Sequence, residues 1–173
     1  MSENIEIKAI CHDLNATERR IREITRRSPN DDYQVDTYFN VTHGRLKLRE
    51  STIDGNYLIP YVRADEAGPR RSQYAKISVD NPELVKELFS MLMGTHIVVS
   101  KKRKIYIDDN VRIHLDQVEN LGTFIEIEAV MDKNNNDKQV EIQKVHRLMN
   151  LIGISEADLI PFSYESLLIS QNQ

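Results

Sequence analysis

The residues best suited to chemistry lie where charged and apolar side chains alternate. After Gly44 the sequence runs Arg45-Leu46-Lys47-Leu48-Arg49. In a β-strand, successive side chains point to opposite faces, so the three cations would share one face and the two leucines the other. Guanidinium and ammonium groups are the side chains that bind phosphate oxygens. This stretch predicts a wall that binds a multivalent anion.

Other stretches with the same alternation contain carboxylates. Glu126 and Glu128 share one face of a predicted strand, and Glu6 lies in the stretch Asn4-Ile5-Glu6-Ile7-Lys8. Asp116 ends the stretch Val111-Arg112-Ile113-His114-Leu115-Asp116. Carboxylate oxygens are the ligands that Mg²⁺ and Mn²⁺ prefer. Glu6, Asp116, Glu126 and Glu128 are therefore the candidate metal ligands.

For any one strand, a charged face also fits a sheet whose polar side meets water. Like charges at neighbouring positions of a sheet repel one another, however, and here they recur within strands, as in Lys101 and Arg103. Such clusters are tolerated where they converge on an anion and a cation that neutralise them. In enzymes of phosphoryl transfer, carboxylates generally bind a metal ion on one side of the site, and cationic side chains bind the phosphates on the other.

The elements that carry these residues predict one domain, residues 1–173, of the α+β class. Period-two alternation predicts eight strands at 3–11, 33–42, 44–50, 56–63, 72–79, 96–107, 110–117 and 122–131. Period-3.6 spacing predicts helices at 14–27, 82–93 and 137–152, with a short one near 164–170. A polar run at 132–137 is predicted to be a loop.

Eight antiparallel strands are enough to close a barrel. The helices need an apolar surface to cover, so helices on the outside would leave the charged faces of the strands lining the lumen. A charged lumen must hold water, ions or a polar ligand. The expected fold is a closed eight-stranded antiparallel β-barrel, or tunnel, with helices packed outside.

The composition of the chain limits the classes of binding partner that we expect. The chain has 173 residues and a net charge of −4, with 23 basic and 27 acidic residues, so long-range attraction to nucleic acid is not expected. The single cysteine, Cys11, cannot form an internal disulfide. No apolar stretch approaches the ~20 residues of a membrane span, and the N-terminus lacks signal-peptide features. We expect a cytoplasmic protein without membrane or nucleic-acid partners, and a homodimer is left open.

The order of these motifs resembles the CYTH superfamily, also called triphosphate tunnel metalloenzymes. Asn4 to Lys8 looks like the E-x-E-x-K signature of that family. The resemblance continues, in order, through Asp36-Thr37-Tyr38-Phe39, Gly44 to Glu50, Lys101-x-Arg103, Arg112 to Asp116, Leu121 to Glu128, Leu148-Met149-x-Leu151 and Tyr164-x-x-Leu167-Leu168. It therefore covers nearly the whole chain, and the ordered set is specific.

The resemblance implies a tunnel with triphosphate on a basic wall and Mg²⁺ or Mn²⁺ on an acidic wall. Glu6, Glu126 and Glu128 would be metal ligands, with Asp116 as a helper. The phosphate ligands would be Lys8, Lys47, Arg49, Arg63, Lys101 and Arg103, with Arg45, Lys76 and Arg112 as further members. Tyr38 and Lys101 are the nearest candidates for the Tyr–Lys pair by which some relatives activate the nucleophile.

One departure from the signature is Asn4, which stands where the family has its first glutamate. An amide oxygen can still coordinate a metal, but it is neutral, so the site has one negative charge fewer. This weakens the predicted metal affinity and leaves open whether one or two metal ions bind. The alternative is that Asn4 is a strand residue without a role in the site.

Three functions stay open at this point. The sequences of the motifs are most similar to those of the class IV adenylyl cyclase branch, which would convert ATP to cyclic AMP and pyrophosphate. The first alternative is a hydrolase that acts on thiamine triphosphate or inorganic tripolyphosphate. The second is a module that binds phosphorylated ligands without turnover. In each case the partner is a small-molecule triphosphate such as ATP.

Overall fold

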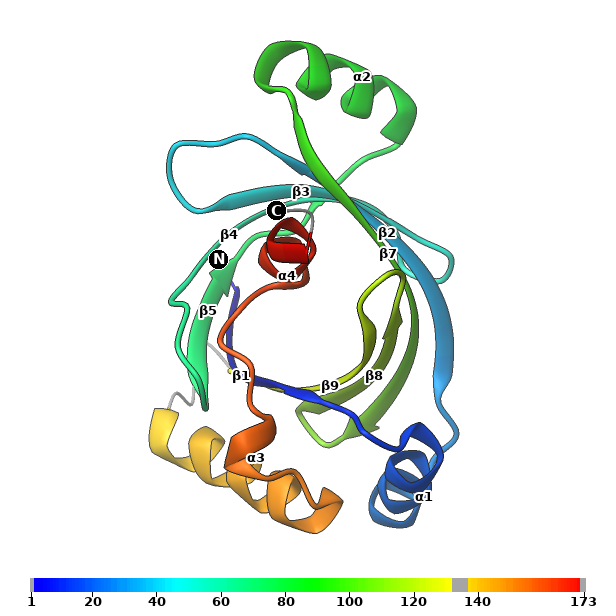
Figure 1. Cartoon of the computed structure of the whole chain (residues 1–173), viewed down its shortest axis with the longest axis vertical. Helices are drawn as coiled ribbons and strands as arrows, with labels where there is room; N and C mark the ends of the chain where they lie inside the picture. Colours follow the sequence, from blue (N-terminus) through cyan, green and yellow to red (C-terminus); the bar gives the residue numbers. More distant parts are fainter. Residues whose placement is uncertain (1, 132–136, 172–173) are drawn as a thin grey trace.

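The computed structural model describes residues 2–131 and 137–171, in which eight antiparallel strands close into a barrel (Figure 1). The strands are β1 (Ser2–Ile10), β2 (Asn30–Phe39), β3 (Arg45–Ser51), β4 (Gly55–Arg63), β5 (Arg70–Tyr74), β7 (Thr95–Asp108), β8 (Val111–Val118) and β9 (Gly122–Val130). Around the barrel their order is β3-β2-β7-β8-β9-β1-β5-β4, and a β3–β4 pairing closes the ring. The predicted fold class is confirmed.

The predicted strand 72–79 is interrupted. Its second part is β6 (Ile77–Ser78), which pairs with β4 at Tyr57 and Leu58, while β5 pairs with β4 at residues 61–63. Both pairings follow one register on the same side of β4, so β6 continues β5 after a break at Ala75 and Lys76. The loop predicted at 132–137 lies, except for Asp137, outside the described residues.

Two helices cover the outer face of one side of the barrel (Figure 1). They are α1 (Leu14–Thr25) and α3 (Lys138–Ile152). Asp13 caps the first by accepting a hydrogen bond from the Ala16 amide, and α3 ends at Gly153, whose φ of 85° favours glycine. Apolar side chains of both helices pack on the isoleucines of β1, β8 and β9. Burying each such isoleucine is worth about 1.5–3 kcal/mol.

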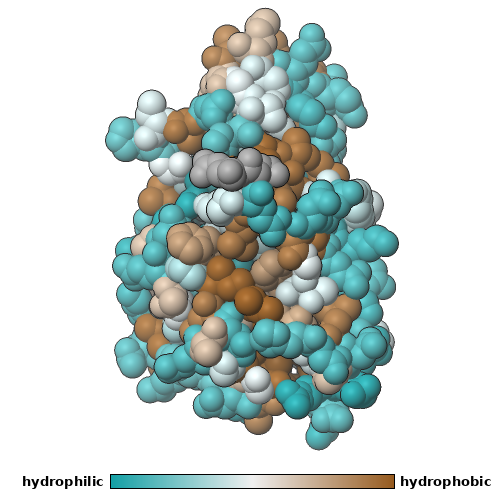
Figure 2. All heavy atoms as spheres, in the orientation of Figure 1, coloured by the Kyte–Doolittle hydropathy of each residue, from teal (hydrophilic) through white to brown (hydrophobic). Residues whose placement is uncertain are grey.

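The other helices lie apart from this layer. The helix α2 (Pro82–Met93) packs on β2 and β3 and projects from the barrel, where Leu84, Leu88, Met91 and Leu92 are exposed (Figures 1 and 2). A single 3-10 turn, η1 (Glu156–Asp158), precedes α4 (Tyr164–Gln171), which lies across one end of the barrel. Among the described helices, none has both the length and the apolar character that crossing a membrane requires.

The alternation of charged and apolar residues sorts the two faces of the barrel as predicted. Ile5, Ile7, Ile125 and Ile127 are at most 1% exposed and pack under α1 and α3. Their charged neighbours in sequence face the lumen. The apolar core of this protein therefore lies between the barrel and its helices, and the barrel interior is left for a polar site.

Candidate functional site

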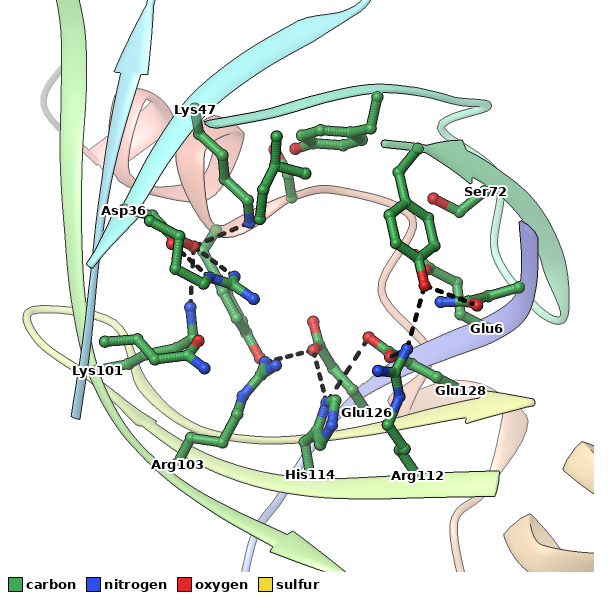
Figure 3. Close-up of a pocket in the computed structure, with 18 of the residues that line it drawn as sticks. Glu6, Asp36, Lys47, Ser72, Lys101, Arg103, Arg112, His114, Glu126 and Glu128 are labelled. Carbon is green, nitrogen blue, oxygen red and sulfur yellow. Dashed lines mark hydrogen bonds and ion pairs between the residues drawn. The ribbon is translucent and has the colours of Figure 1, made fainter. Parts of the chain in front are cut away.

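The lumen of the barrel holds a cavity of about 330 Å³ (Figure 3). Its wall contains all of the site residues predicted from the sequence except Arg45 and Asp116. Those on the wall are Glu6, Lys8, Tyr38, Lys47, Arg49, Arg63, Lys76, Lys101, Arg103, Arg112, Glu126 and Glu128. With Ser72 and Tyr74 of β5 and Tyr164 of α4, residues from all eight barrel strands and from α4 line this one space.

The two exceptions are engaged elsewhere. Arg45 forms two hydrogen bonds to the carboxylate of Asp65, at 3.0 and 2.9 Å, and an ion pair with Glu165 at 3.2 Å. Asp116 is fully buried beneath the wall, where its carboxylate accepts hydrogen bonds from Arg103 and from the Tyr164 hydroxyl. Asp116 therefore holds Arg103 and Tyr164 of the wall in place, whereas Arg45 links the segment after β4 to α4.

Asp36 organises one side of the cavity, which we call the basic wall and define by Lys47, Arg49 and Lys101. Its carboxylate accepts hydrogen bonds from Lys47 at 2.9 Å, from Arg49 at 2.7 Å and from Lys101 at 3.0 Å. Burial would raise the pKa of Asp36, but the three cations hold it well below its usual range. One fixed anion therefore gathers three cations whose combined charge exceeds its own.

The two lysines of the basic wall have pKa values close to neutral pH. Burial, together with the neighbouring Arg49 and Lys101, lowers the pKa of Lys47 to about 7. Burial also lowers the pKa of Lys101 to about 8, and Asp36 opposes this shift. Both ammonium groups can therefore lose or gain a proton under physiological conditions, and a polyanion would favour the charged forms.

The opposite side of the cavity is the acidic wall, which we define by Glu6, Glu126 and Glu128 (Figure 3). Pairing of β1 with β9 sets Glu6 directly opposite Glu128. Each carboxylate also has a cationic partner: Glu6 contacts Arg63 at 2.7 Å, Glu126 contacts Lys8 at 3.0 Å and Arg103 at 2.5 Å, and Glu128 contacts Arg112 at 3.1 Å.

These partners give the three carboxylates different pKa values. Burial raises the pKa of Glu6, and the charge of Glu128 adds to this effect. The pKa of Glu126 is well below its usual range because Lys8 and Arg103 outweigh burial. The pKa of Glu128 is lowered as well, by His114 and Arg112 against the effect of burial. A divalent cation among the three would relieve the repulsion that acts on Glu6.

His114 completes a set of metal-ligating atoms with Glu126 and Glu128. One ligand atom from each of these residues lies within 4.8 Å of the other two. The Nδ1 atom of His114 is buried and has no hydrogen-bond partner within the described part of the chain. Two oxygens and a nitrogen at this spacing suit a divalent ion, so the donor set fits the metal that the sequence predicts.

Arg63 carries free donors toward an anion. One terminal nitrogen binds Glu6, while Nε and the other terminal nitrogen are buried without a partner among residues 2–131 and 137–171. A buried N–H group without an acceptor costs free energy, so such groups mark a place where a ligand belongs. Arg63 therefore has the geometry to bind a phosphate oxygen while still holding a carboxylate of the acidic wall.

A second lysine, Lys47, lies close to Tyr38 in the structure. Tyr38 lies opposite Lys47 in the β2–β3 register, and the Lys47 ammonium is 5.5 Å from the centre of its ring. Lys101 lies instead 5.9 Å from the ring centre of Tyr164. The lysine that faces Tyr38 across neighbouring strands is therefore Lys47.

Sequence reasoning did not single out several residues of the site. Asp36 and His114 lie within the motifs quoted above. Asp36 is two residues from Tyr38 and His114 is two residues from Arg112, so alternation along a strand would have placed each on the lumen face. Gln34 alternates with Asp36 in the same way and lines the cavity. Tyr164, which stacks on Lys8 at 3.4 Å, comes from α4, and no local pattern indicated that it would enter the lumen.

Comparison with known proteins agrees with this geometry. A family model described as CYTH domain matches residues 2–164. A Methanocaldococcus jannaschii protein named "Putative adenylate cyclase" is 26% identical over 174 residues, which cover 94% of this chain and 97% of the relative.

Two solved structures have a similar fold. A Pyrococcus horikoshii protein matches with a TM-score of 0.84 at 25% identity, over 96% of this chain and 99% of that protein. A Hippeastrum protein, described as a "Putative adenylyl cyclase" with "a dominant" triphosphatase activity, has a TM-score of 0.64 at 12% identity, over 99% of this chain and 96% of its own. At such identity the second likeness concerns the fold alone.

Proposed function

Because the chain belongs to the CYTH domain family, whose model matches residues 2–164, we propose that it is a metal-dependent enzyme that converts a nucleoside triphosphate within the barrel lumen. The reaction proposed first is the cyclisation of ATP to cyclic AMP and pyrophosphate. The name of the Methanocaldococcus jannaschii relative supports this choice.

The observation that carries the proposal is Arg63, which joins the two halves of the site. It binds Glu6 with one nitrogen and has two buried N–H groups without a partner among the described residues. Lys8 also lines the lumen and forms an ion pair with Glu126. These cations would hold phosphate oxygens close to the carboxylates, which would hold the metal.

The acidic wall would hold Mg²⁺ or Mn²⁺ through Glu6, Glu126 and Glu128. When bound, the ion supplies a Lewis acid that lowers the pKa of the attacking hydroxyl and neutralises phosphate charge. The protein itself orients the triphosphate with Lys8, Lys47, Arg49, Arg63, Lys101 and Arg103. Negative charge that develops on the phosphate oxygens is stabilised by these preorganised cations.

Cyclisation also needs a group that accepts the proton of the ribose 3′-hydroxyl as its oxygen attacks the α-phosphate. Two lysines of the basic wall have suitable pKa values, about 7 for Lys47 and about 8 for Lys101. Lys101 with Tyr38 is the pair expected from the sequence. Lys47, which faces Tyr38, is the second candidate for the proton acceptor.

Gln34 favours a substrate with an organic group. Its Nε2 donates to Asp32 at 2.6 Å, which fixes the orientation of the amide. Its Oε1 is then left buried in the cavity wall without a partner in the described chain. A hydroxyl of the ribose or an amine of the base could donate to this oxygen, whereas a fully ionised inorganic tripolyphosphate has no donor to offer.

A second candidate function is hydrolysis of a triphosphate, with water as the nucleophile. The density of charge on the wall favours it, since the aliphatic residues among the lining are Ile53, Ile59 and Ile105. The activity described for the Hippeastrum protein also supports it. Both reactions use the same cations and carboxylates.

A product assay separates these functions. Purified protein is incubated with Mg²⁺ or Mn²⁺ and, separately, ATP, GTP, thiamine triphosphate or tripolyphosphate, and the products are resolved by ion-exchange chromatography. Cyclic AMP with pyrophosphate supports the cyclase, and inorganic phosphate supports the hydrolase. Arg63→Gln should lose turnover, whereas the exposed Arg71→Gln should keep it. Binding without turnover of any of these compounds would contradict an enzyme and favour a binding module.

A further inference from the structure

We infer that His114 is a metal ligand through Nδ1, and that the acidic wall therefore selects a first-row transition ion such as Mn²⁺ over Mg²⁺. The inference rests on the proposed function, because it concerns the metal of the same site. It adds a nitrogen ligand to a site whose predicted ligands are all oxygens.

The position of His114 follows from the pairing of β8 with β9. His114 lies directly opposite Glu126, and Arg112 lies opposite Glu128, so His114 is diagonal to Glu128 on the same face. All three side chains point into the lumen (Figure 3). Strand pairing therefore places the imidazole on the same face as the two carboxylates and next to both.

The distances fit a shared ion better than direct contact. Nδ1 of His114 lies 3.6 Å from an oxygen of Glu126 and 3.7 Å from one of Glu128, beyond ordinary hydrogen-bond length. Ligands of one octahedral ion at about 2.1 Å are separated by roughly 3–4 Å. The gap between the imidazole and the carboxylates is thus the size that an ion would bridge.

Burial supports the same conclusion. His114 is 4% exposed, and its Nδ1 has no hydrogen-bond partner in the described residues. A buried polar atom of this kind is unfavourable unless something binds it. Lys8, Arg103 and Arg112 form the closer ion pairs with the two carboxylates.

His114 also bears on the departure at Asn4. Asn4 supplies a neutral oxygen where the family signature has a glutamate, so the site is poorer in hard anionic ligands. Magnesium prefers oxygen ligands, whereas imidazole raises the affinity for transition ions. Replacing a carboxylate by an amide while adding an imidazole shifts the preference away from Mg²⁺ and toward Mn²⁺ or its heavier neighbours.

The test is pulsed electron paramagnetic resonance of Mn²⁺ added to the purified full-length protein without nucleotide. A coordinated imidazole gives a ¹⁴N modulation of the electron spin echo, which an all-oxygen site does not give. His114→Gln should abolish the modulation and weaken Mn²⁺ binding by about 10- to 100-fold, the range seen even for residues that only support a ligand. Its effect on Mg²⁺ affinity should be smaller.

The matched control is His146→Gln, on the exposed face of α3, which should keep both the modulation and the affinity. Thermal melting without metal shows whether His114→Gln is folded, and His114→Asn provides a second variant if it is not. Bound Mn²⁺ without nitrogen modulation in the unaltered protein, or modulation that persists in His114→Gln, would overturn the role of His114 alone. Failure of the protein to bind Mn²⁺ would overturn the metal-dependent function as well.

Discussion

Arg103 and Asp116 face each other across β7 and β8 and form a bidentate ion pair, with N–O distances of 2.7 and 2.5 Å, beneath the cavity wall. The same guanidinium also reaches Glu126 at 2.5 Å. Asp116 therefore sets the orientation of a cation that lies between the basic and the acidic walls. Expected from its sequence to help bind the metal, Asp116 is placed by the structure behind Arg103.

Asp116→Asn should destabilise the protein by about 3–5 kcal/mol, because it leaves a buried guanidinium short of its counter-charge. Urea denaturation measures this change. The control is Asp65→Asn, which removes a similar carboxylate–arginine contact at the surface and should cost less than about 1 kcal/mol. Equal effects of the two substitutions would mean that Arg103 does not depend on Asp116.

Glu128→Gln and Arg63→Gln should respond differently to metal. Glu128→Gln removes an anionic ligand, so activity should fall and then recover as Mg²⁺ or Mn²⁺ is raised. Arg63→Gln removes phosphate contacts worth on the order of 2–4 kcal/mol of transition-state stabilisation, which extra metal cannot restore. Activity is measured against metal concentration for both variants. The same metal response in both would refute separate roles for Glu128 in metal binding and for Arg63 in phosphate binding.

Triphosphate binding should weaken as pH rises above neutral. The pKa of Lys47 is about 7 in the free protein, and a bound polyanion raises it, so the complex holds more protons than the free protein as the pH rises above about 7. By linkage, affinity then falls by up to about tenfold per pH unit for one proton. Calorimetry with tripolyphosphate at pH 8 in two buffers should reveal proton uptake. Lys47→Met should remove much of this uptake, and unchanged uptake would assign it to Lys101 or another group.

Asn4→Glu should tighten Mg²⁺ binding, since it restores the first glutamate of the signature. Without metal the new charge lies on the same strand face as Glu6, and repulsion should lower stability by about 1 kcal/mol. Thermal melting with and without Mg²⁺ measures both effects, and Asn4→Gln serves as the uncharged control. If the Mg²⁺-induced increase in melting temperature is the same in both variants, position 4 does not contact the metal.

The sequence predicted most of the fold and much of the site because barrel strands obey a period of two. Alternation alone assigned Lys47, Arg49, Glu126 and Glu128 to the lumen, where the structure places them. Alternation cannot tell how deep a side chain lies, so Asp116 was expected at the wall although it sits behind Arg103.

Contacts between segments that are distant in the chain could not be predicted from the sequence either. The break at Ala75 and Lys76 within a predicted strand depends on how β4 pairs with its neighbours. The entry of Tyr164 into the lumen depends on where α4 packs. Which cation serves which carboxylate, as in the gathering of three cations by Asp36, follows from closure of the barrel and not from spacing along a strand.

That closure also has a consequence for the time course of folding. β1 pairs with β9 and β5, and in doing so it brings Glu6 beside Glu128, which lies far away in the sequence. Hairpins such as β8–β9 join near neighbours in sequence and can form early, whereas this pairing requires closing a long loop and belongs among the slow steps. The acidic wall is complete only when β1 has paired with β9. Metal affinity should consequently appear late during refolding, after most of the strand content has formed.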